Sequence, residues 1–216
     1  MDLLNSGFYA WDNFWENQSG KRYDSWAKRR IVKVLSAYIE PGMDVLDLGC
    51  GTGFFSAYFI SRGSNVYSMD YSRKALSIAK GATNGKSKMY LNANILDDSA
   101  LADINVKFDI VFTDGLLEHY SKEEQGAIMH NMKLVKKEQG YIINFVPNKL
   151  SLWSIVRPFV MNIEEEPFIM REVIELHRRN GLSVISFGGI NVLPFRISPE
   201  RLLARRFGML FYCVAI

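Results

Sequence analysis

The chain has 216 residues, which suits a single domain with a substantial buried core. Its 48% hydrophobic and 23% charged residues are typical of a globular protein, and a formal net charge of +3 neither requires nor excludes an anionic partner. Two cysteines, Cys50 and Cys213, exclude a disulfide framework and a C-x-x-C zinc site, so we expect a reduced, cytoplasmic protein.

The N-terminus and the apolar runs agree with that expectation. Residues 1–5 lack the basic stretch and long apolar run of a signal peptide. The most apolar later segment, 150–161, contains Arg157 and Pro158 and is too short to cross a bilayer, so no transmembrane segment is expected. Short basic runs favour solvated helix faces over contact with nucleic acid, and no nucleic-acid partner is expected. These runs are 28–30, 178–179 and 205–206.

An aromatic-rich segment opens the chain, and helices and strands then alternate. A first helix is expected from Asp24 or Ser25, both good N-caps, to the turn at Pro41. The next elements are expected to be a strand over 43–48, a glycine loop at 49–53, a helix over 54–62, a strand over 65–69, a helix over 72–80, and strands over 88–93 and 108–113.

The second half begins with a strong helix pattern. Ser121 and Glu124 form an S-x-x-E capping box, an apolar stripe follows, and Gly140 is expected just past the end of the helix. The remaining elements are expected to be a strand over 141–146, a helix from about 169 to 180, a strand over 182–187, a helix from Ser198-Pro199, and a strand over 209–214.

This order predicts an α/β fold with a doubly wound, mostly parallel seven-stranded sheet, helices on both faces and an antiparallel edge strand. We expect one domain over 1–216, in which residues 1–40 form a helical, aromatic lid and residues 147–167 form a substrate-side insertion. Alternatively, the aromatic residues of these two segments only cover the edge of the sheet. Ligands of such sheets bind at the carboxyl ends of the strands, near the topological switch point.

The sharpest local pattern is VLDLGCGTG at 45–53, which predicts a strand, a glycine loop and the start of a helix. Gly49, Gly51 and Gly53 let the backbone turn tightly and let a ligand approach free N–H groups. Asp70 follows Gly49 by 21 residues, at a strand end where a carboxylate can accept both hydroxyls of a ribose.

Two features argue against a dinucleotide as the ligand of this loop. Phe54 stands where the dinucleotide fingerprint needs a third glycine, and we assign Phe54 and Phe55 to core packing. Asp47, two residues before the loop, would repel a pyrophosphate but complements an ammonium group. The ligand is therefore expected to carry a ribose and a cationic amine, as S-adenosylmethionine does.

Residues 43–146 resemble the class I S-adenosylmethionine-dependent methyltransferases, particularly the small-molecule branch. The matching pieces are VLDLGCGTG at 45–53, YSMDYS at 67–72, ANIL at 93–96, FDIVFTDGLLEHY at 108–120 and GYIINFVPN at 140–148. They occur in the order and spacing of that family, which makes them more specific together than a glycine loop alone.

The resemblance implies a role for each matching residue in binding S-adenosylmethionine. Gly49, Cys50 and Gly51 would present backbone to the methionine portion, and Asp70 would hold the ribose, with Tyr71 against one face of the adenine. Two further positions, Asn94 and Ile95, would lie at the adenine edge and face, and Asp114 would lie near the sulfonium. The family usually has Asp where Asn94 stands; Asn keeps an acceptor for the adenine amine. Taken singly, Asp47 and Asp70 can also be loop or helix caps.

His119 is the candidate general base. It follows the strand over 108–113 within Leu117-Glu118-His119-Tyr120, at the expected catalytic edge of the sheet. A base helps methyl transfer to a hydroxyl of high pKa, and less so to an amine or a thiol. The alternative is that His119 only orders its loop through hydrogen bonds. His130 and His177 are expected on surface faces of helices, without a role.

The Leu-Glu-His element also resembles the quinone-biosynthesis O-methyltransferases. Some members place a further glutamate three residues before the conserved one and hold a divalent metal with it. Gly115 occupies that position here, so no metal is expected.

These residues predict an enzyme that methylates a small molecule, at oxygen in preference to nitrogen. The expected acceptor is aromatic or apolar. The Asn/Asp-Pro-Pro-aromatic element of amine methyltransferases that act on nucleic acid is missing, since Thr113-Asp114-Gly115-Leu116 stands there. A paired-glutamate loop of the arginine methyltransferases is not reproduced either. The alternatives are a non-catalytic S-adenosylmethionine-binding partner subunit and N-methylation of a small molecule or macromolecule.

Overall fold

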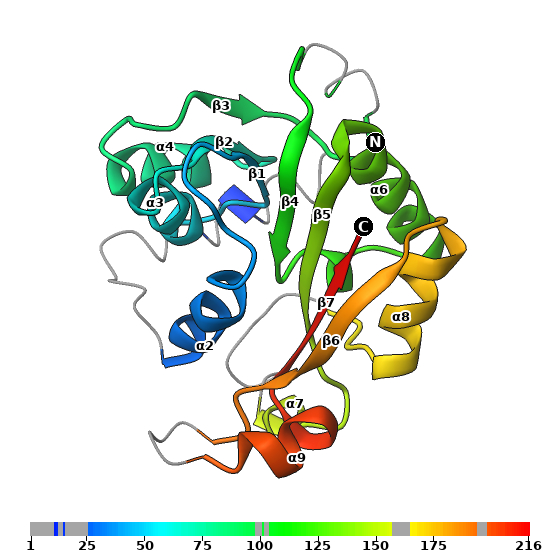
Figure 1. The fold of residues 1–216 in the computed structure, drawn as a ribbon. Coiled ribbons are helices and arrows are strands. Elements are labelled where there is room, and N and C mark those ends of the chain that lie inside the picture. Colours follow the sequence, from blue (N-terminus) through cyan, green and yellow to red (C-terminus); the bar gives the residue numbers. More distant parts are fainter. Residues whose placement is uncertain are drawn as a thin grey trace.

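The structure is a computed structural model, and it describes residues 11, 12, 15, 26–97, 101, 104–156, 165–193 and 198–216. Its centre is a seven-stranded sheet with the strand order β3-β2-β1-β4-β5-β7-β6 (Figure 1). The strands are β1 (Asp44–Leu48), β2 (Asn65–Asp70), β3 (Met89–Asn92), β4 (Phe108–Asp114), β5 (Lys136–Pro147), β6 (Val184–Ile190) and β7 (Leu210–Ala215).

The strand directions confirm the predicted α/β class. Neighbouring strands from β3 to β5 are parallel, and β7 pairs antiparallel with both β5 and β6. The antiparallel pairing comes from the last two strands of the chain, with β7 inserted next to β5 and β6 outermost at the edge. Because β7 is antiparallel to both neighbours, β6 runs in the same direction as β5.

Helices cover both faces of this sheet, and a short 3₁₀ turn follows β4 (Figure 1). The elements are α2 (Trp26–Leu35), α3 (Phe54–Ser61), α4 (Arg73–Ala82), η1 (Leu117–His119), α6 (Lys122–Val135), α7 (Trp153–Val156), α8 (Met170–Arg179) and α9 (Glu200–Phe207). One buried apolar cluster unites α2 and α3 with the sheet, and another unites α6 and α8 with its opposite face.

The register brings the site residues to one edge. Leu48, the last residue of β1, pairs with Met69 on β2 and with Thr113 on β4. The residues that follow each strand therefore meet where the chain switches from one half of the sheet to the other, which is where ligands of open α/β sheets bind.

Local patterns set the boundaries of two helices as the sequence predicts. Ser121 caps α6 in a capping box, in which its hydroxyl accepts from the Glu124 N–H and the Glu124 carboxylate accepts from the Ser121 N–H. Ser72 caps α4 by accepting a hydrogen bond from the N–H of Ala75. The expected caps of the first helix, Asp24 and Ser25, lie outside the described residues.

Gly140 was expected to follow a helix, and that prediction is wrong. The helix ends at Val135, and Gly140 lies inside β5, which begins directly at Lys136. A Cβ at this position would lie 2.7 Å from the carbonyl oxygen of Phe108, so glycine is required by the close approach of β4.

His177 was expected on a helix surface and is instead completely buried. Its Nδ1 lies 2.8 Å from the carbonyl oxygen of Val173, and its Nε2 lies 2.8 Å from the side-chain amide of Asn144 on β5. Burial lowers the pKa of His177 to about 4, so the ring is neutral at physiological pH. The neighbouring basic residues Arg178 and Arg179 suggested an exposed face, but they lie on the opposite, exposed side of α8. His130 is exposed, as predicted.

Candidate active site

A cavity of about 510 Å³ opens at the carboxyl edge of β1, β2 and β4, a size suited to a small-molecule ligand. Nine of the ten residues that the sequence assigns to the site line it. These are Asp47, Gly49, Cys50, Gly51, Asp70, Tyr71, Ile95, Asp114 and His119.

Asn94 is the exception, because it lies beside the cavity while Ala93 and Ile95 line it. Its carboxamide oxygen accepts a hydrogen bond of 3.0 Å from the N–H of Leu96, which closes the turn after β3. The Asn94 side chain therefore serves the backbone of this turn, and its contact with adenine stays a prediction.

The glycine loop needs its glycines for two different reasons. Gly49, Gly51 and Gly53 all have positive φ angles, of 66°, 50° and 73°. A Cβ on Gly53 would lie 2.6 Å from the Cα of Ala79, so this position allows α3 to pack against α4. A Cβ on Gly51 would lie 2.9 Å from the indole of Trp15, which covers the loop from the N-terminal segment.

Asp70 connects the loop to the next strand. Its carboxylate accepts hydrogen bonds of 2.9 Å from the N–H groups of Gly51 and Ser72. Burial raises the pKa of Asp70 to about 6, against the lowering effect of these N–H donors. Asp70 thus orders the loop, while the remaining lone pairs of its two oxygens can accept the hydroxyls of a ribose.

Asp47 is a buried carboxylate below the glycine loop. It accepts a hydrogen bond of 2.5 Å from the hydroxyl of Ser56, which in turn lies 2.8 Å from the hydroxyl of Ser68. Burial raises the pKa of Asp47 to about 7, and the charges of Asp114 and Asp70 act in the same direction. A cationic group in this cavity would favour the ionised carboxylate, so the site is electrostatically suited to an ammonium or a sulfonium.

The N-terminal segment reaches into the same cavity. Trp11 and Trp15 line it, and their rings stack with centroids 6.5 Å apart. Asp12, between them, hydrogen-bonds to the hydroxyl of Ser72 and accepts from the N–H of Lys74 at 3.4 Å. Asp12 therefore binds the N-terminus of α4 and fixes the two tryptophans over the glycine loop.

His119 also lines the cavity, at the end of η1. Its ring contacts that of Trp11 edge-on, with centroids 4.9 Å apart. Its Nε2 lies 3.9 Å from Oε1 of Glu165, which also lines the cavity. Both side chains are largely shielded from solvent, with exposed fractions of 9% and 7%.

Sequence reasoning missed Glu165. It lies in the segment after β5, far from His119 in the chain, and no spacing rule connects the two. A parallel bridge between Asn148 and Phe168, and a hydrogen bond of 2.8 Å from the N–H of Glu166 to the carbonyl of Glu118, hold this segment against the end of η1.

The pair forms part of a group that has the composition of a metal site. One ligand atom each from Glu118, His119 and Glu165 lie within 4.8 Å of one another. Two carboxylates and one imidazole can bind a divalent cation. In the sequence, only Glu118 and His119 match the metal-binding pattern, because Gly115 occupies the position of the additional glutamate. In the structure, Glu165 supplies a second carboxylate from another segment.

The cysteines are not candidates for chemistry. Cys50 and Cys213 are both buried free thiols. Burial raises the pKa of the Cys50 thiol well above its ordinary value, and it raises that of Cys213 to about 12. Neither provides a thiolate at physiological pH.

Comparison with known proteins identifies the family. Residues 39–186 match the methyltransferase domain family. Ubiquinone biosynthesis O-methyltransferase of Coxiella burnetii is 26% identical over 197 residues, which cover 84% of this chain and 82% of that protein. Ribosomal protein L11 methyltransferase of Dictyoglomus turgidum is 29% identical over 147 residues, or 67% of this chain. Magnesium-protoporphyrin O-methyltransferase of Synechocystis is 30% identical over 112 residues, or 52% of this chain.

The chain spans only 44% and 48% of the latter two relatives, so their full activities do not transfer with the match. Solved structures agree on the fold. A methyltransferase from Anabaena variabilis has a TM-score of 0.73 at 14% identity, and the match covers all of this chain and 95% of the Anabaena protein. Magnesium protoporphyrin IX methyltransferase from Synechocystis has a TM-score of 0.63 at 16% identity, and the match covers all of this chain and 87% of the Synechocystis protein. The glycine loop, the strand-end carboxylates and the sheet order thus have a common explanation: the chain belongs to the class I S-adenosylmethionine-dependent methyltransferases.

Proposed function

We propose that the protein transfers a methyl group from S-adenosylmethionine to a hydroxyl of a small, aromatic or apolar acceptor. One observation carries this proposal: the candidate base His119 and the carboxylates Asp47 and Asp70 line the same cavity. The cavity therefore has a cofactor half, with Asp47 and Asp70, and an acceptor half, with His119.

The cofactor half suits S-adenosylmethionine in charge and shape. Asp70 can hold the ribose, and Asp47 complements the positive charge of the amino acid portion. The ammonium of Lys28 also lines the cavity, 4.6 Å from the ring centroid of Phe54, and can meet a carboxylate. Bound S-adenosylmethionine supplies an electrophilic methyl group, and the protein contributes alignment and exclusion of water.

His119 can accept the proton of the attacking hydroxyl. Glu165, at 3.9 Å from Nε2, favours the protonated imidazolium that results. Tyr120 cannot share that role, because burial raises the pKa of its hydroxyl to about 12 and keeps it protonated. We therefore assign the role of base to the imidazole, with Tyr120 as a hydrogen-bond donor.

The acceptor side is apolar and aromatic. Its described lining residues come from four separate segments, and they include Trp11, Trp15, Phe54, Trp153, Met209 and Leu210. Flat indole and phenyl surfaces stack favourably on a flat apolar molecule. In this proposal residues 1–40 act as a lid and 147–167 as a substrate-side insertion of one domain, supported by Trp11 and Trp15 from the first segment and by Trp153 and Glu165 from the second.

Incubation of the protein with methyl-labelled S-adenosylmethionine and fractionated cell extract tests the proposal. We expect label in a small organic-soluble product, with the methyl group on oxygen. Asp70→Ala serves as the control with weakened cofactor binding. Binding of S-adenosylmethionine without transfer to any fraction would favour the non-catalytic alternative, and label on nitrogen would favour N-methylation.

A further inference from the structure

Helix α9 leaves large apolar side chains in water at the same edge of the sheet as the cavity. Leu202 is 86% exposed, and Leu203 and Phe207 are 40% and 37% exposed. Nearby, in the loop after β5, Leu150 and Leu152 are 54% and 63% exposed. Single exposed leucines are common, but a group of five large apolar side chains at one end of a protein marks an interaction surface.

The helix that carries three of these side chains packs closely on the sheet. Ala204 is the one buried residue of α9, and it packs so closely on β6 that a Cβ on Gly189 would lie 1.7 Å from its carbonyl oxygen. The side-chain amide of Asn148 donates to the carbonyls of Arg206 and Gly208, at 2.9 and 2.7 Å. The exposed face of α9 is therefore presented by a fixed helix, joined to the loop that carries Leu150 and Leu152.

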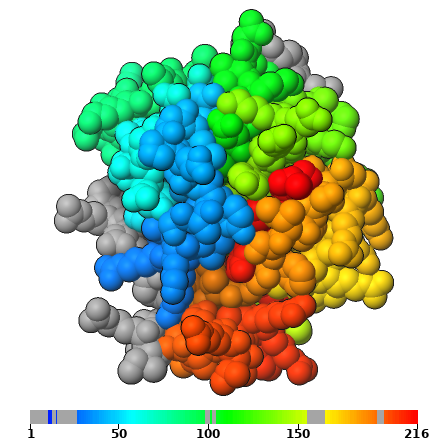
Figure 2. Space-filling model, viewed as in Figure 1, coloured from blue at the N-terminus to red at the C-terminus, as the bar shows by residue number. Residues whose placement is uncertain are grey.

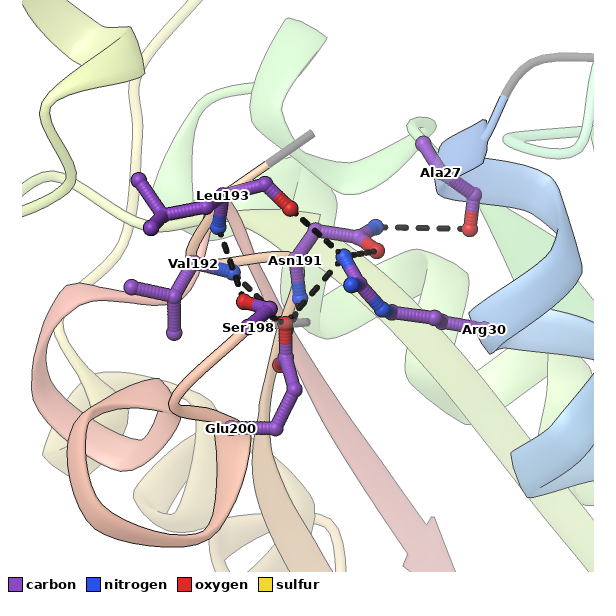
Figure 3. A network of polar contacts seen from close by, with 7 residues as sticks. All are labelled: Ala27, Arg30, Asn191, Val192, Leu193, Ser198 and Glu200. Atoms are coloured by element: carbon purple, nitrogen blue, oxygen red, sulfur yellow. Dashed lines mark hydrogen bonds and ion pairs between the residues drawn. The ribbon is translucent and has the colours of Figure 1, made fainter. Parts of the chain in front are cut away.

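The single carboxylate of α9 is turned inward (Figure 3). Glu200 accepts hydrogen bonds from the N–H groups of Asn191 and Val192, at 2.9 and 3.0 Å. It also forms an ion pair of 3.1 Å with Arg30 of α2. The inward network neutralises the negative charge of the helix and connects it to the helix that carries Lys28 and Ile31 into the cavity.

The outward charges of the helix are then all positive. Arg201, Arg205 and Arg206 are exposed, and Lys149 is exposed beside Leu150. The guanidinium of Arg205 stacks over the ring of Phe187 at 4.9 Å, and that of Arg206 over the ring of Phe207 at 5.5 Å. Leucines and a phenylalanine mixed with arginines are the composition of a helix that lies in the interface of an anionic membrane.

The position of α9 relates this surface to the cavity. Because β6 runs in the same direction as β5, α9 follows β6 at the carboxyl edge of the sheet, next to α7 (Figure 1). Trp153 of α7 and Met209 and Leu210, which follow α9, line the cavity. In the space-filling view, α9 forms the outermost surface at this end of the molecule (Figure 2).

We propose that Leu150, Leu152 and the outward face of α9 form a docking surface for an anionic lipid bilayer. The arginines and Lys149 would meet the headgroup phosphates, and the leucines and Phe207 would enter the headgroup–acyl boundary. The protein would lie on the membrane surface with its cavity near the lipid. This mode of binding needs no membrane-spanning helix, and none of the described helices is long and apolar enough to span a bilayer. This surface goes beyond the proposed methyl transfer, and its test contains neither methyl donor nor acceptor.

Cosedimentation of the full chain with vesicles tests the proposal. The vesicles are pure phosphatidylcholine, or phosphatidylcholine with about one quarter phosphatidylglycerol. We expect binding to the anionic vesicles, little binding to the neutral ones, and loss of binding at high salt. The triple variant Arg201→Gln/Arg205→Gln/Arg206→Gln should bind about a hundredfold more weakly, since each of the three cations near an anionic surface contributes about fivefold. Leu202→Gln should also bind more weakly.

Matched controls separate this surface from general charge and hydrophobicity. Arg171→Gln/Arg178→Gln/Arg179→Gln removes the same charge from exposed positions of α8, and Leu134→Gln changes a leucine that is 50% exposed at the end of α6. Both should bind like the wild type. Equal losses in the controls, or no preference for anionic vesicles, would overturn the proposal.

Two other occupants of the surface give different results. A second copy of the chain would appear as a dimer in sedimentation velocity that Leu202→Gln dissociates, without vesicle binding, and that result overturns the proposal. Selective binding to RNA in place of vesicles overturns it as well. If a variant fails to fold, hydrogen exchange of the wild type decides: added anionic vesicles should protect the backbone of α9, and unchanged exchange there contradicts docking.

Discussion

The two halves of the cavity are built in different ways. In the cofactor half, one continuous stretch supplies Asp47, the glycine loop and Asp70, which lie on β1, β2 and the turn between β1 and α3. The acceptor half gathers single residues from distant segments, among them Trp11, His119 and Glu165. Local backbone geometry therefore determines the first half, whereas tertiary packing of several loops determines the second. If the two halves act independently, a substitution in one half should change cofactor affinity and a substitution in the other should change turnover.

The largest effect is expected from Asp70→Ala, which should weaken S-adenosylmethionine binding by roughly 2–4 kcal/mol, because two ribose hydroxyls lose a charged acceptor. Calorimetry measures the affinity, and circular dichroism checks that the fold survives. Asp109→Ala, at the opposite edge of the sheet, is the control. Unchanged affinity would reduce Asp70 to a structural role, that of fixing Gly51 and Ser72.

Asp47→Asn should stabilise the protein without cofactor, by about 4 kcal/mol at pH 8 and by less than about 1 kcal/mol near pH 4. Burial raises the pKa of Asp47 to about 7, above its ordinary value of 3.8, so the wild type loses stability as pH rises between those values. The amide carries no charge and avoids that loss, while its oxygen can still accept from Ser56. Urea denaturation at both pH values measures the difference. An equal effect at pH 4 and pH 8 would mean that the charge is not the cause. The same variant should bind S-adenosylmethionine more weakly, since the ammonium loses its partner.

The sequence predicts that the glycine loop and Asp70 meet at one cavity, because the information for that arrangement is local. A glycine loop needs positive φ at particular positions, and a carboxylate at the end of the next strand must meet that loop when the strands are parallel. The same reasoning placed all seven strands and the capping box at Ser121. It failed for Gly140, because the close approach of β4 is a tertiary contact.

The acceptor half was predicted only in part, for the same physical reason. His119 belongs to a local element after β4, so the sequence indicates it. Glu165 reaches His119 through the bridge between Asn148 and Phe168, and nothing in the local sequence specifies that contact. His177 was misplaced because its burial depends on a polar partner, Asn144, on another element.

His119→Ala should lower turnover by roughly a hundredfold and leave cofactor affinity nearly unchanged, because the base acts in the acceptor half. The wild-type rate should rise with pH as the imidazole loses its proton, and the variant should lack that dependence. His130→Ala, on an exposed helix surface, is the control. If the variant instead binds cofactor and acceptor more weakly and keeps the shape of the pH profile, His119 only orders its loop.

Glu165→Gln should lower turnover by about tenfold, since the imidazolium loses a neighbouring negative charge. Glu166→Gln, at the adjacent exposed position, should behave like the wild type. A chelator should have no effect on the wild type. Loss of activity with a chelator and recovery with magnesium would show that Glu118, His119 and Glu165 act as metal ligands instead.

The smallest effect is expected from Asn94→Asp, a change within about 1 kcal/mol in cofactor affinity. The carboxylate keeps the oxygen that accepts from the N–H of Leu96, so the turn after β3 should remain intact. It also keeps an acceptor for the adenine amine and loses only a donor. Asn92→Asp is the informative contrast, because the amide of Asn92 donates to the carbonyl of Asp70 at 3.2 Å and to that of Tyr71 at 2.7 Å. A carboxylate there loses both donors, so this control should weaken binding more. Calorimetry on the two variants decides the matter: if Asn94→Asp proves the more damaging, the Asn94 side chain binds adenine directly, and the cofactor half extends beyond the residues that line the cavity.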